Sequence, residues 1–169
     1  RARIELARLK QRAGQSKEAL DALLELAETT PTALPLAVPL LVELSTATGQ
    51  EAKVYDLLRQ RYDVMPSLDL LDGIVALEAA QGNGANSREW YVRHLEHEPS
   101  LVAAAKWLND ETLEHEQFHP QVQRALDQAA KPLTRYRCAA CGFEARQHFW
   151  QCPGCQTWDS YPARRVEEL

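Results

Sequence analysis

The sequence has few glycines and few aromatic side chains: of its 169 residues, seven are glycine and 7% are Phe, Trp or Tyr. Folds built from many short strands need turn glycines and aromatic or β-branched side chains, so we do not expect a β-rich fold. Leu, Ala, Glu, Gln and Arg dominate instead, and all five favour helices. The composition therefore predicts a mainly α protein.

Long apolar runs are also lacking. The best candidate, Leu34–Leu44, contains Pro35 and Pro39 and is shorter than the roughly 20 apolar residues that span a bilayer. No signal peptide is recognisable, and the chain opens on Arg1 rather than Met. We therefore expect a soluble piece of a longer protein, in which any N-terminal membrane anchor precedes Arg1.

Charge is unevenly distributed along the chain. The formal net charge is -5 at pH 7, which gives no general attraction to nucleic acid. Residues 131–169 hold six basic and four acidic side chains and all four cysteines, whereas residues 1–130 carry a net charge of -7. The change near Lys131 predicts two domains, residues 1–130 and residues 131–169.

Glycine and proline recur with one period in the first domain. Three glycines lie 35 and 33 residues apart, three prolines have the same spacing, and a helix-capping residue follows each proline. These residues are Gly14, Gly49 and Gly82; Pro31, Pro66 and Pro99; and Thr32, Ser67 and Ser100. We interpret each period as two helices joined at the glycine and ended by the proline. The repeats lie near 1–32, 33–66 and 67–99, followed by capping helices at Leu101–Leu108 and Pro120–Ala130.

This pattern resembles the tetratricopeptide repeat family. The matching positions of the first unit are Leu6, Ala7, Gly14, Ala19, Leu23 and Pro31, whereas Val54 and Ser87 replace the preferred alanine in the next two. The resemblance implies a helical solenoid whose concave face binds other proteins. Candidate surface residues are Tyr55, Arg59, Tyr62, Trp90 and Arg93, each of which could equally serve packing. An irregular helical bundle is the alternative fold.

His115-Glu116-Gln117-Phe118-His119 matches the H-E-x-x-H pattern of zinc proteases. Pro120 follows directly, and a residue before proline is pushed out of the helical region, so we expect His119 to leave the face of His115. We therefore expect a solvated loop there, and exposed side chains at His94 and His97. No catalytic residue and no enzymatic activity are predicted.

The four cysteines form two C-x-x-C pairs separated by ten residues: Cys138, Cys141, Cys152 and Cys155. Two such knuckles can place four thiolates around one ion, with a hairpin in the segment between them. We predict a four-cysteine metal site, with Gly142 allowing the first turn and nearby arginines offsetting thiolate charge. The arginines are Arg135, Arg137 and Arg146, and the expected apolar shell is Tyr136, Phe143, Phe149, Trp150, Trp158 and Tyr161. His148 lies among them but is not expected to be a ligand.

Two disulfides would need an oxidising compartment, which nothing else in the sequence suggests. Zn²⁺ and iron both suit four thiolates, and we favour zinc in the purified protein. Because fewer than 40 residues make a small core, the metal should supply much of this domain's stability.

Helical repeats followed by Tyr136-Arg-Cys-x-x-Cys-Gly-Phe143 and Phe149-Trp150-x-Cys-Pro-x-Cys155-x-x-Trp158 are similar to the lipopolysaccharide assembly protein B family. That family joins tetratricopeptide repeats to a C-terminal rubredoxin-type metal domain. Carried over, Cys138, Cys141, Cys152 and Cys155 would be the ligands, while Gln156 departs from the glycine that often follows the second knuckle.

The same resemblance implies a non-catalytic adaptor on the cytoplasmic side of the bacterial inner membrane, held by an N-terminal helix absent here. It implies partnership with the membrane protease FtsH in breakdown of the lipid A pathway deacetylase, with other lipopolysaccharide assembly proteins, and with no nucleic acid. The metal domain would dock on the repeats, and the opposite net charges of the two domains favour this.

Two other functions stay open. The cysteine spacing also resembles the zinc ribbon of the RadA recombination ATPases, which permits a nucleic-acid-binding ribbon, although the sequence has no G-x-x-x-x-G-K-[ST] phosphate loop. With iron bound, the domain could instead transfer electrons as rubredoxin-like modules do.

Overall fold

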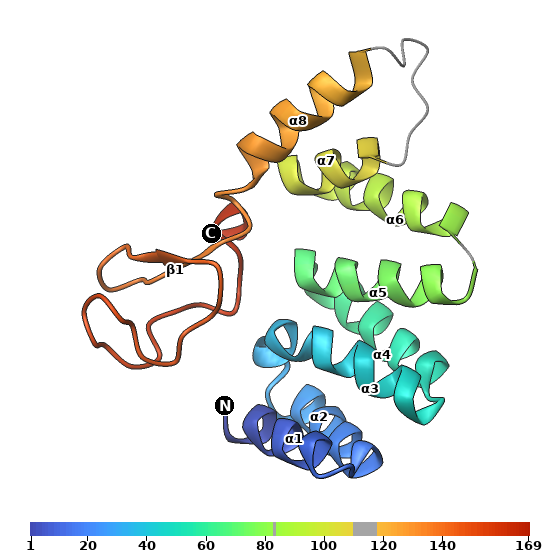
Figure 1. Cartoon of the computed structure of the whole chain (residues 1–169), viewed down its shortest axis with the longest axis vertical. Coiled ribbons are helices and arrows are strands. Elements are labelled where there is room, and N and C mark those ends of the chain that lie inside the picture. The colour runs from blue at the N-terminus through green and yellow to red at the C-terminus, as the bar shows by residue number, and fades with distance from the viewer. Residues whose placement is uncertain (83, 110–117) are drawn as a thin grey trace. The chain divides into compact units, whose positions relative to one another are not determined.

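A computed structural model describes residues 1–82, 84–109 and 118–169. Among these residues it contains eight α-helices, two 3-10 helices and one two-stranded sheet (Figure 1). The helices are α1 (Ala2–Arg12), α2 (Ser16–Thr29), α3 (Val38–Thr48), α4 (Glu51–Val64), α5 (Leu68–Ala80), α6 (Gly84–His97), α7 (Leu101–Asn109) and α8 (His119–Ala130). The 3-10 helices are η1 (Pro31–Ala37) and η3 (Val166–Glu168), and the strands are β1 (Tyr136–Arg137) and β2 (Glu144–Ala145). The mainly α fold with a small C-terminal cysteine module is confirmed.

The chain divides into two compact units, Arg1–Gly82 and Asn83–Leu169. Helices α6, α7 and α8 therefore fall in the same unit as the cysteines, whereas the composition changes later, near Lys131. Both predicted capping helices are present, as α7 and α8.

The first unit is built from helices that pack on their neighbours in sequence. Helix α1 packs on α2, α2 on α3, and α3 on both α4 and α5 (Figure 1). Large aliphatic side chains fill the spaces between them, among them Leu23, Leu41, Leu58 and Ile74, all with 0% exposure. A helix pair cannot cover its own apolar face, so each pair depends on the next for its core.

The repeated glycines adopt the backbone conformation that the pattern predicts. Gly14, Gly49 and Gly82 have φ values of 77°, 67° and 79°. Side chains with a Cβ rarely adopt this left-handed region, which explains the choice of glycine at each turn.

Two of the three predicted helix caps are confirmed. The Ser67 Oγ accepts a hydrogen bond from the Leu70 N–H at 3.2 Å, and Ser100 Oγ accepts one from Ala103 N–H at 3.0 Å. The cap at Thr32 is wrong, because Thr32 lies inside η1, which begins at Pro31, and α3 begins only at Val38. Pro35 has no N–H for a continuous α-helical ladder, so the chain forms a 3-10 helix first.

The segment Pro31–Thr48, formed by η1 and α3, is by length and composition alone apolar enough to cross a membrane. In this structure its apolar side chains serve the core, since Leu34, Val38 and Leu41 are at most 2% exposed. Because the core helix of a soluble protein passes the same test, the segment gives no argument for a membrane span.

Gly73 of α5 lies against side chains of α3 and α4. A Cβ at this position would lie 2.4 Å from Val38 Cγ1 and 2.9 Å from Leu58 Cδ1. We expect Gly73→Ala to lower the free energy of unfolding by about 1–3 kcal/mol, because the overpacking outweighs the better helix propensity of alanine. Urea denaturation would measure this, with Gly14→Ala as a comparison that tests backbone strain without crowding. An unchanged or higher midpoint for Gly73→Ala would contradict it.

The candidate surface residues have different surroundings. Tyr62 and Trp90 are buried and serve packing, while the Tyr55 hydroxyl donates a hydrogen bond to Glu78 at 2.6 Å. Arg59 is exposed, and the exposed Arg93 lies 5.1 Å over the ring of Trp90. The expectation for His94 is wrong: this side chain is 2% exposed, whereas His97 is exposed as expected.

Candidate metal centre

Each C-x-x-C pair lies at the end of its own short hairpin. Strands β1 and β2 pair antiparallel on either side of the first knuckle, with Tyr136 opposite Ala145. An isolated antiparallel bridge between Gln151 and Trp158 closes the second. The hairpins therefore enclose the knuckles, rather than lying between them as the sequence suggested.

The two knuckles share one hydrogen-bond pattern. In each knuckle, the N–H of the first cysteine donates a hydrogen bond to the carbonyl five residues later. The carbonyl of the same cysteine accepts a hydrogen bond from the N–H four residues later. The pairs are Cys138 N–Phe143 O at 2.9 Å, Cys152 N–Thr157 O at 2.9 Å, Gly142 N–Cys138 O at 2.9 Å and Gln156 N–Cys152 O at 2.8 Å. This pattern orients both cysteines of each knuckle toward the other knuckle.

The four sulfur atoms have the spacing that one ion requires. Cys138 Sγ lies 3.8 Å from Cys155 Sγ, Cys141 Sγ lies 3.7 Å from Cys152 Sγ, and all four lie within 4.8 Å of one another. A tetrahedron with metal–sulfur bonds of about 2.3 Å has edges of about 3.8 Å. The four cysteines are thus positioned to bind a metal ion, and all four are free thiols.

Hydroxyl groups that the sequence analysis missed contact two of the sulfurs. Ser160 Oγ lies 3.2 Å from Cys138 Sγ, and Thr157 Oγ1 lies 3.3 Å from Cys155 Sγ. Hydrogen bonding to Ser160 is the main cause that lowers the pKa of Cys138 to about 6, and bonding to Thr157 lowers that of Cys155. These residues would stabilise metal-bound thiolates.

The pKa values of the thiols shift in opposite directions. The Phe143 N–H lowers the pKa of Cys141, but contacts with the sulfurs of Cys155 and its neighbours and desolvation outweigh it, raising the pKa to about 12. Four clustered thiolates repel one another, so a cation is needed before all four lose their protons. Metal binding should therefore release protons.

The expected apolar shell is partly correct. Tyr136 and Tyr161 are each 5% exposed, and Phe149 and Trp150 are half-buried, but Phe143 and Trp158 are 44% and 53% exposed. The imidazole of His148 completes the cluster, edge-on to Tyr136 at 5.5 Å and to Trp150 at 4.7 Å. His148 Nε2 lies 3.0 Å from the Tyr161 carbonyl, and burial lowers its pKa, so it packs as a neutral side chain.

Two of the arginines near the knuckles form ion pairs with a glutamate. Arg137 and Arg135 pair with the Glu144 carboxylate, at 2.8 Å and 3.7 Å. These ion pairs join β1 and the residue before it to β2, because Glu144 lies opposite Arg137 in the antiparallel register. The offsetting of thiolate charge by the arginines stays a prediction.

The H-E-x-x-H pattern falls mostly outside the described residues, which exclude His115, Glu116 and Gln117. His119 begins α8, so its expected departure from helical conformation is wrong; proline is tolerated in the first turn of a helix. Its Nε2 lies 2.9 Å from the Leu108 carbonyl and ties α8 to α7.

The C-terminal residues pair with the segment that leads into the module. Val166 N–H donates to the Arg135 carbonyl at 2.7 Å and Glu167 N–H to the Leu133 carbonyl at 3.2 Å. The Arg165 guanidinium donates to the Thr134 carbonyl at 2.8 Å and lies 4.3 Å over the Tyr136 ring. Both ends of the module are thus held together.

Glu167 also joins this segment to α7. Its carboxylate accepts hydrogen bonds from Ser100 Oγ at 2.7 Å and from the N–H groups of Leu101 and Val102 at 2.5 and 3.2 Å. A carboxylate satisfies the first N–H groups of a helix and complements its dipole. Packing of the module on the repeats themselves stays a prediction.

Gln156 has φ 61°, in the left-handed region that glycine occupies in the first knuckle. We expect Gln156→Gly to raise the free energy of unfolding of the metal-loaded chain by about 1 kcal/mol, since the strain of a Cβ is removed. Thermal unfolding would measure this, and Gly142→Gln should destabilise by a similar amount. A stabilising Gly142→Gln would contradict the symmetry between the knuckles.

Comparison with known proteins agrees with this geometry. A family described as "Rubredoxin metal binding domain" matches residues 136–161, the two hairpins with all four cysteines. Lipopolysaccharide assembly protein B of Escherichia coli K12 is 26% identical over 99 residues, which cover 55% of this chain and 25% of the relative. The chain is similar to lipopolysaccharide assembly protein B. It spans about a quarter of the length of that relative, and the protein of E. coli O157:H7 matches equally.

This similarity to lipopolysaccharide assembly protein B confirms the resemblance found in the sequence. A shorter match joins the chain to DNA repair protein RadA of Halalkalibacterium halodurans, 45% identical over 31 residues, or 18% of this chain and 7% of that protein.

Proposed function

We propose that this protein is a non-catalytic adaptor that regulates lipopolysaccharide synthesis. The observation that carries the proposal is the metal-binding module, whose family match lies in a chain similar to lipopolysaccharide assembly protein B. Helices that pack pair on pair supply a surface for protein partners. In this role the protein presents one partner to another.

The proposed partners are the membrane protease FtsH and the lipid A pathway deacetylase, whose breakdown the adaptor promotes. Other lipopolysaccharide assembly proteins complete the set. The protein works on the cytoplasmic side of the bacterial inner membrane, held there by a helix that precedes this region.

The ion is proposed to be Zn²⁺, bound by Cys138, Cys141, Cys152 and Cys155. It would serve structure, because a d¹⁰ ion in a closed four-sulfur site has no open position and no redox chemistry. Metal analysis of the purified chain tests this; a coloured protein that dithionite bleaches reversibly would show iron and favour electron transfer instead.

The adaptor role is tested in the native host with the full-length protein. Depletion should lengthen the lifetime of the deacetylase in a pulse-chase experiment, and pull-down from membranes should recover FtsH. Re-expression of the wild-type protein should restore turnover, while a Cys152→Ser form should not. Unchanged turnover after depletion would contradict the proposal.

The match to RadA favours one second candidate, a nucleic-acid-binding ribbon. The exposed Trp158 could stack on a base. A gel shift that weakens steeply with salt would support this function, and no shift at low salt would reject it.

A further inference from the structure

The first turn of α7 is capped partly from within and partly from outside the helix. Ser100 accepts hydrogen bonds from the N–H groups of Ala103 and Ala104, through its Oγ and its carbonyl, both at 3.0 Å. The N–H groups of the first residues of an α-helix have no acceptor within the helix. Those of the first two residues of α7 donate to the carboxylate of Glu167, at 2.5 and 3.2 Å. Glu167 therefore completes the cap that Ser100 begins.

This capping carboxylate comes from the far side of the metal-binding module in sequence. Helix α7 precedes the module, whereas Glu167 follows it. Two backbone hydrogen bonds hold Glu167 near the helix: Val166 N–H donates to the Arg135 carbonyl at 2.7 Å, and Glu167 N–H to the Leu133 carbonyl at 3.2 Å. The cap thus depends on the meeting of two segments between which the whole module lies.

The segment after the second knuckle is fastened to the first knuckle. The Ser160 carbonyl accepts a hydrogen bond from Ala139 N–H at 2.7 Å, and the Tyr161 hydroxyl donates one to the Phe143 carbonyl at 3.1 Å. The same hydroxyl lies 3.8 Å from Cys152 Sγ. The folded knuckles therefore determine where the chain leaves the module on its way to α7.

Without this folded module, a long flexible loop would join the two paired segments. Bringing the ends of a flexible loop together costs entropy, and the cost grows with the length of the loop. The core of the module is too small to fold without an ion, so loss of the ion would turn residues 136–164 into such a loop. The bonds to Leu133 and Arg135 would then open, and Glu167 would leave α7.

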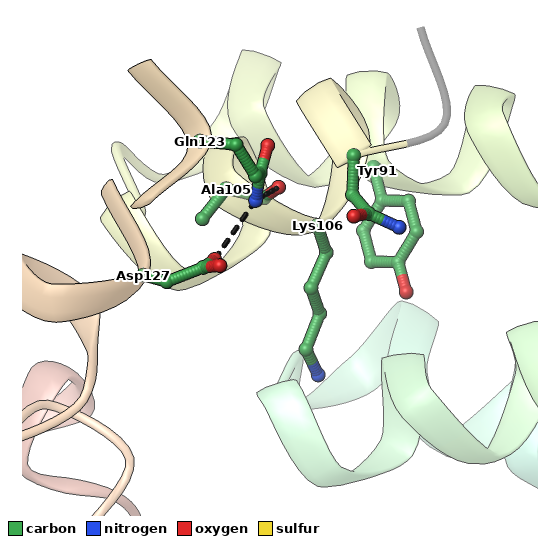
Figure 2. A pocket seen from close by; sticks show the side chains of 6 residues that line it. Tyr91, Ala105, Lys106, Gln123 and Asp127 are labelled. Carbon is green, nitrogen blue, oxygen red and sulfur yellow. Dashed lines mark hydrogen bonds between the residues drawn. The ribbon is translucent and has the colours of Figure 1, made fainter. Parts of the chain in front are cut away.

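The rest of α7 has supports that do not involve the module. Gln123 Nε2 of α8 donates to the Ala105 carbonyl at 3.1 Å and to Asp127 Oδ1 at 2.8 Å (Figure 2). His119 Nε2 lies 2.9 Å from the Leu108 carbonyl. Loss of the capping carboxylate should therefore affect the first turn of α7 and not the second half of the helix.

We propose that Glu167 is a metal-dependent cap of α7. When the ion folds the module, the carboxylate is placed on the helix, and when the ion is lost, the first turn is released. The start of α7 is thereby linked to the metal content of the protein. Such a linkage is reciprocal, so the cap also strengthens metal binding. The inference rests on the proposed metal ion and is independent of the adaptor role.

Amide hydrogen exchange of the Zn²⁺-loaded 169-residue chain, measured before and after Zn²⁺ is removed by a chelator under reducing conditions, tests the proposal. We expect exchange at Leu101 and Val102 to accelerate about tenfold on removal and to slow again when Zn²⁺ is returned. The amides of Leu23 and Leu58 in the first unit, and of Leu108 at the other end of α7, should keep their rates.

Glu167→Ala in the Zn²⁺-loaded chain should give the same fast exchange, and removal of Zn²⁺ from this variant should add no further change. Coupling through one side chain requires non-additivity of this kind. Glu98→Ala removes an exposed carboxylate near the same helix start, so as the matched control it should respond to Zn²⁺ as the wild type does. In competition with a chelator, Glu167→Ala should bind Zn²⁺ about tenfold more weakly than the control.

Unchanged exchange at Leu101 on removal of Zn²⁺ would overturn the proposal. Equal acceleration in Glu167→Ala and the wild type would also overturn it, since α7 would then respond by another route, and so would equal Zn²⁺ affinity of Glu167→Ala and Glu98→Ala. A chain that binds no Zn²⁺ would overturn the metal site together with the cap, and metal analysis of each sample distinguishes this result. None of these outcomes affects the pulse-chase test of the adaptor role.

Discussion

Cys152→Ser is expected to abolish metal binding and to unfold the C-terminal module. Cys152 is 1% exposed, its N–H closes the second knuckle, and its sulfur lies 3.7 Å from that of Cys141. A structural zinc contributes about 10–16 kcal/mol to the folding of zinc-finger peptides at neutral pH, far more than this small aromatic cluster can replace. Metal content should fall from one ion per chain to none, and proteolysis should begin beyond Thr134.

The first unit should survive this substitution, because its core contains no residue of the module. Far-ultraviolet circular dichroism should therefore retain most of the helical signal. Ala140→Ser, which adds a hydroxyl within the first knuckle but keeps all four sulfurs, is the control and should bind metal normally. A protease-resistant module without metal would contradict our account of its stability.

Glu167→Ala is expected to detach the C-terminal segment from α7. The carboxylate accepts hydrogen bonds from one hydroxyl and two backbone N–H groups at the start of this helix. Hydrogen bonds to a charged group each contribute about 1.5–3 kcal/mol, so we expect a loss of about that size in the free energy of unfolding of the second unit. Hydrogen exchange at Leu101 and Val102 should accelerate.

Glu98→Ala removes the same charge near the same helix start from an exposed side chain, so it serves as the control. Glu167→Gln should give an intermediate loss, since its amide oxygen can still accept one bond. Unchanged exchange at Leu101 in Glu167→Ala would show that Ser100 caps the helix unaided.

The sequence predicts what depends on short spacings. The period of glycine and proline locates the helix pairs, because a left-handed turn and a helix stop need those residue types. The two C-x-x-C pairs identify the metal site, because each pair forms a local loop whose sulfurs point the same way. Thr32 is not a cap because Pro35 and Pro39 delay the start of the helix. The repeat period alone predicts an earlier start.

Contacts between distant residues leave no such signal. Glu167 reaches Ser100 across 67 positions, and Ser160 reaches Cys138 across 22. The burial of His94 and the pairing of Arg137 with Glu144 likewise depend on which faces meet in the folded chain. The sequence does not indicate that Glu167 caps a helix, nor that this helix is α7.

Two backbone hydrogen bonds, from Val166 and Glu167 to Arg135 and Leu133, hold the start and the end of the metal-binding segment side by side. The loops between these two paired segments can therefore change in length without changing the distance between the segments. This is the geometry in which insertions are best tolerated. Length variation among natural versions of this protein should accordingly accumulate between the two knuckles, around the exposed Arg146 and Gln147, and not inside either C-x-x-C pair or at the paired segments.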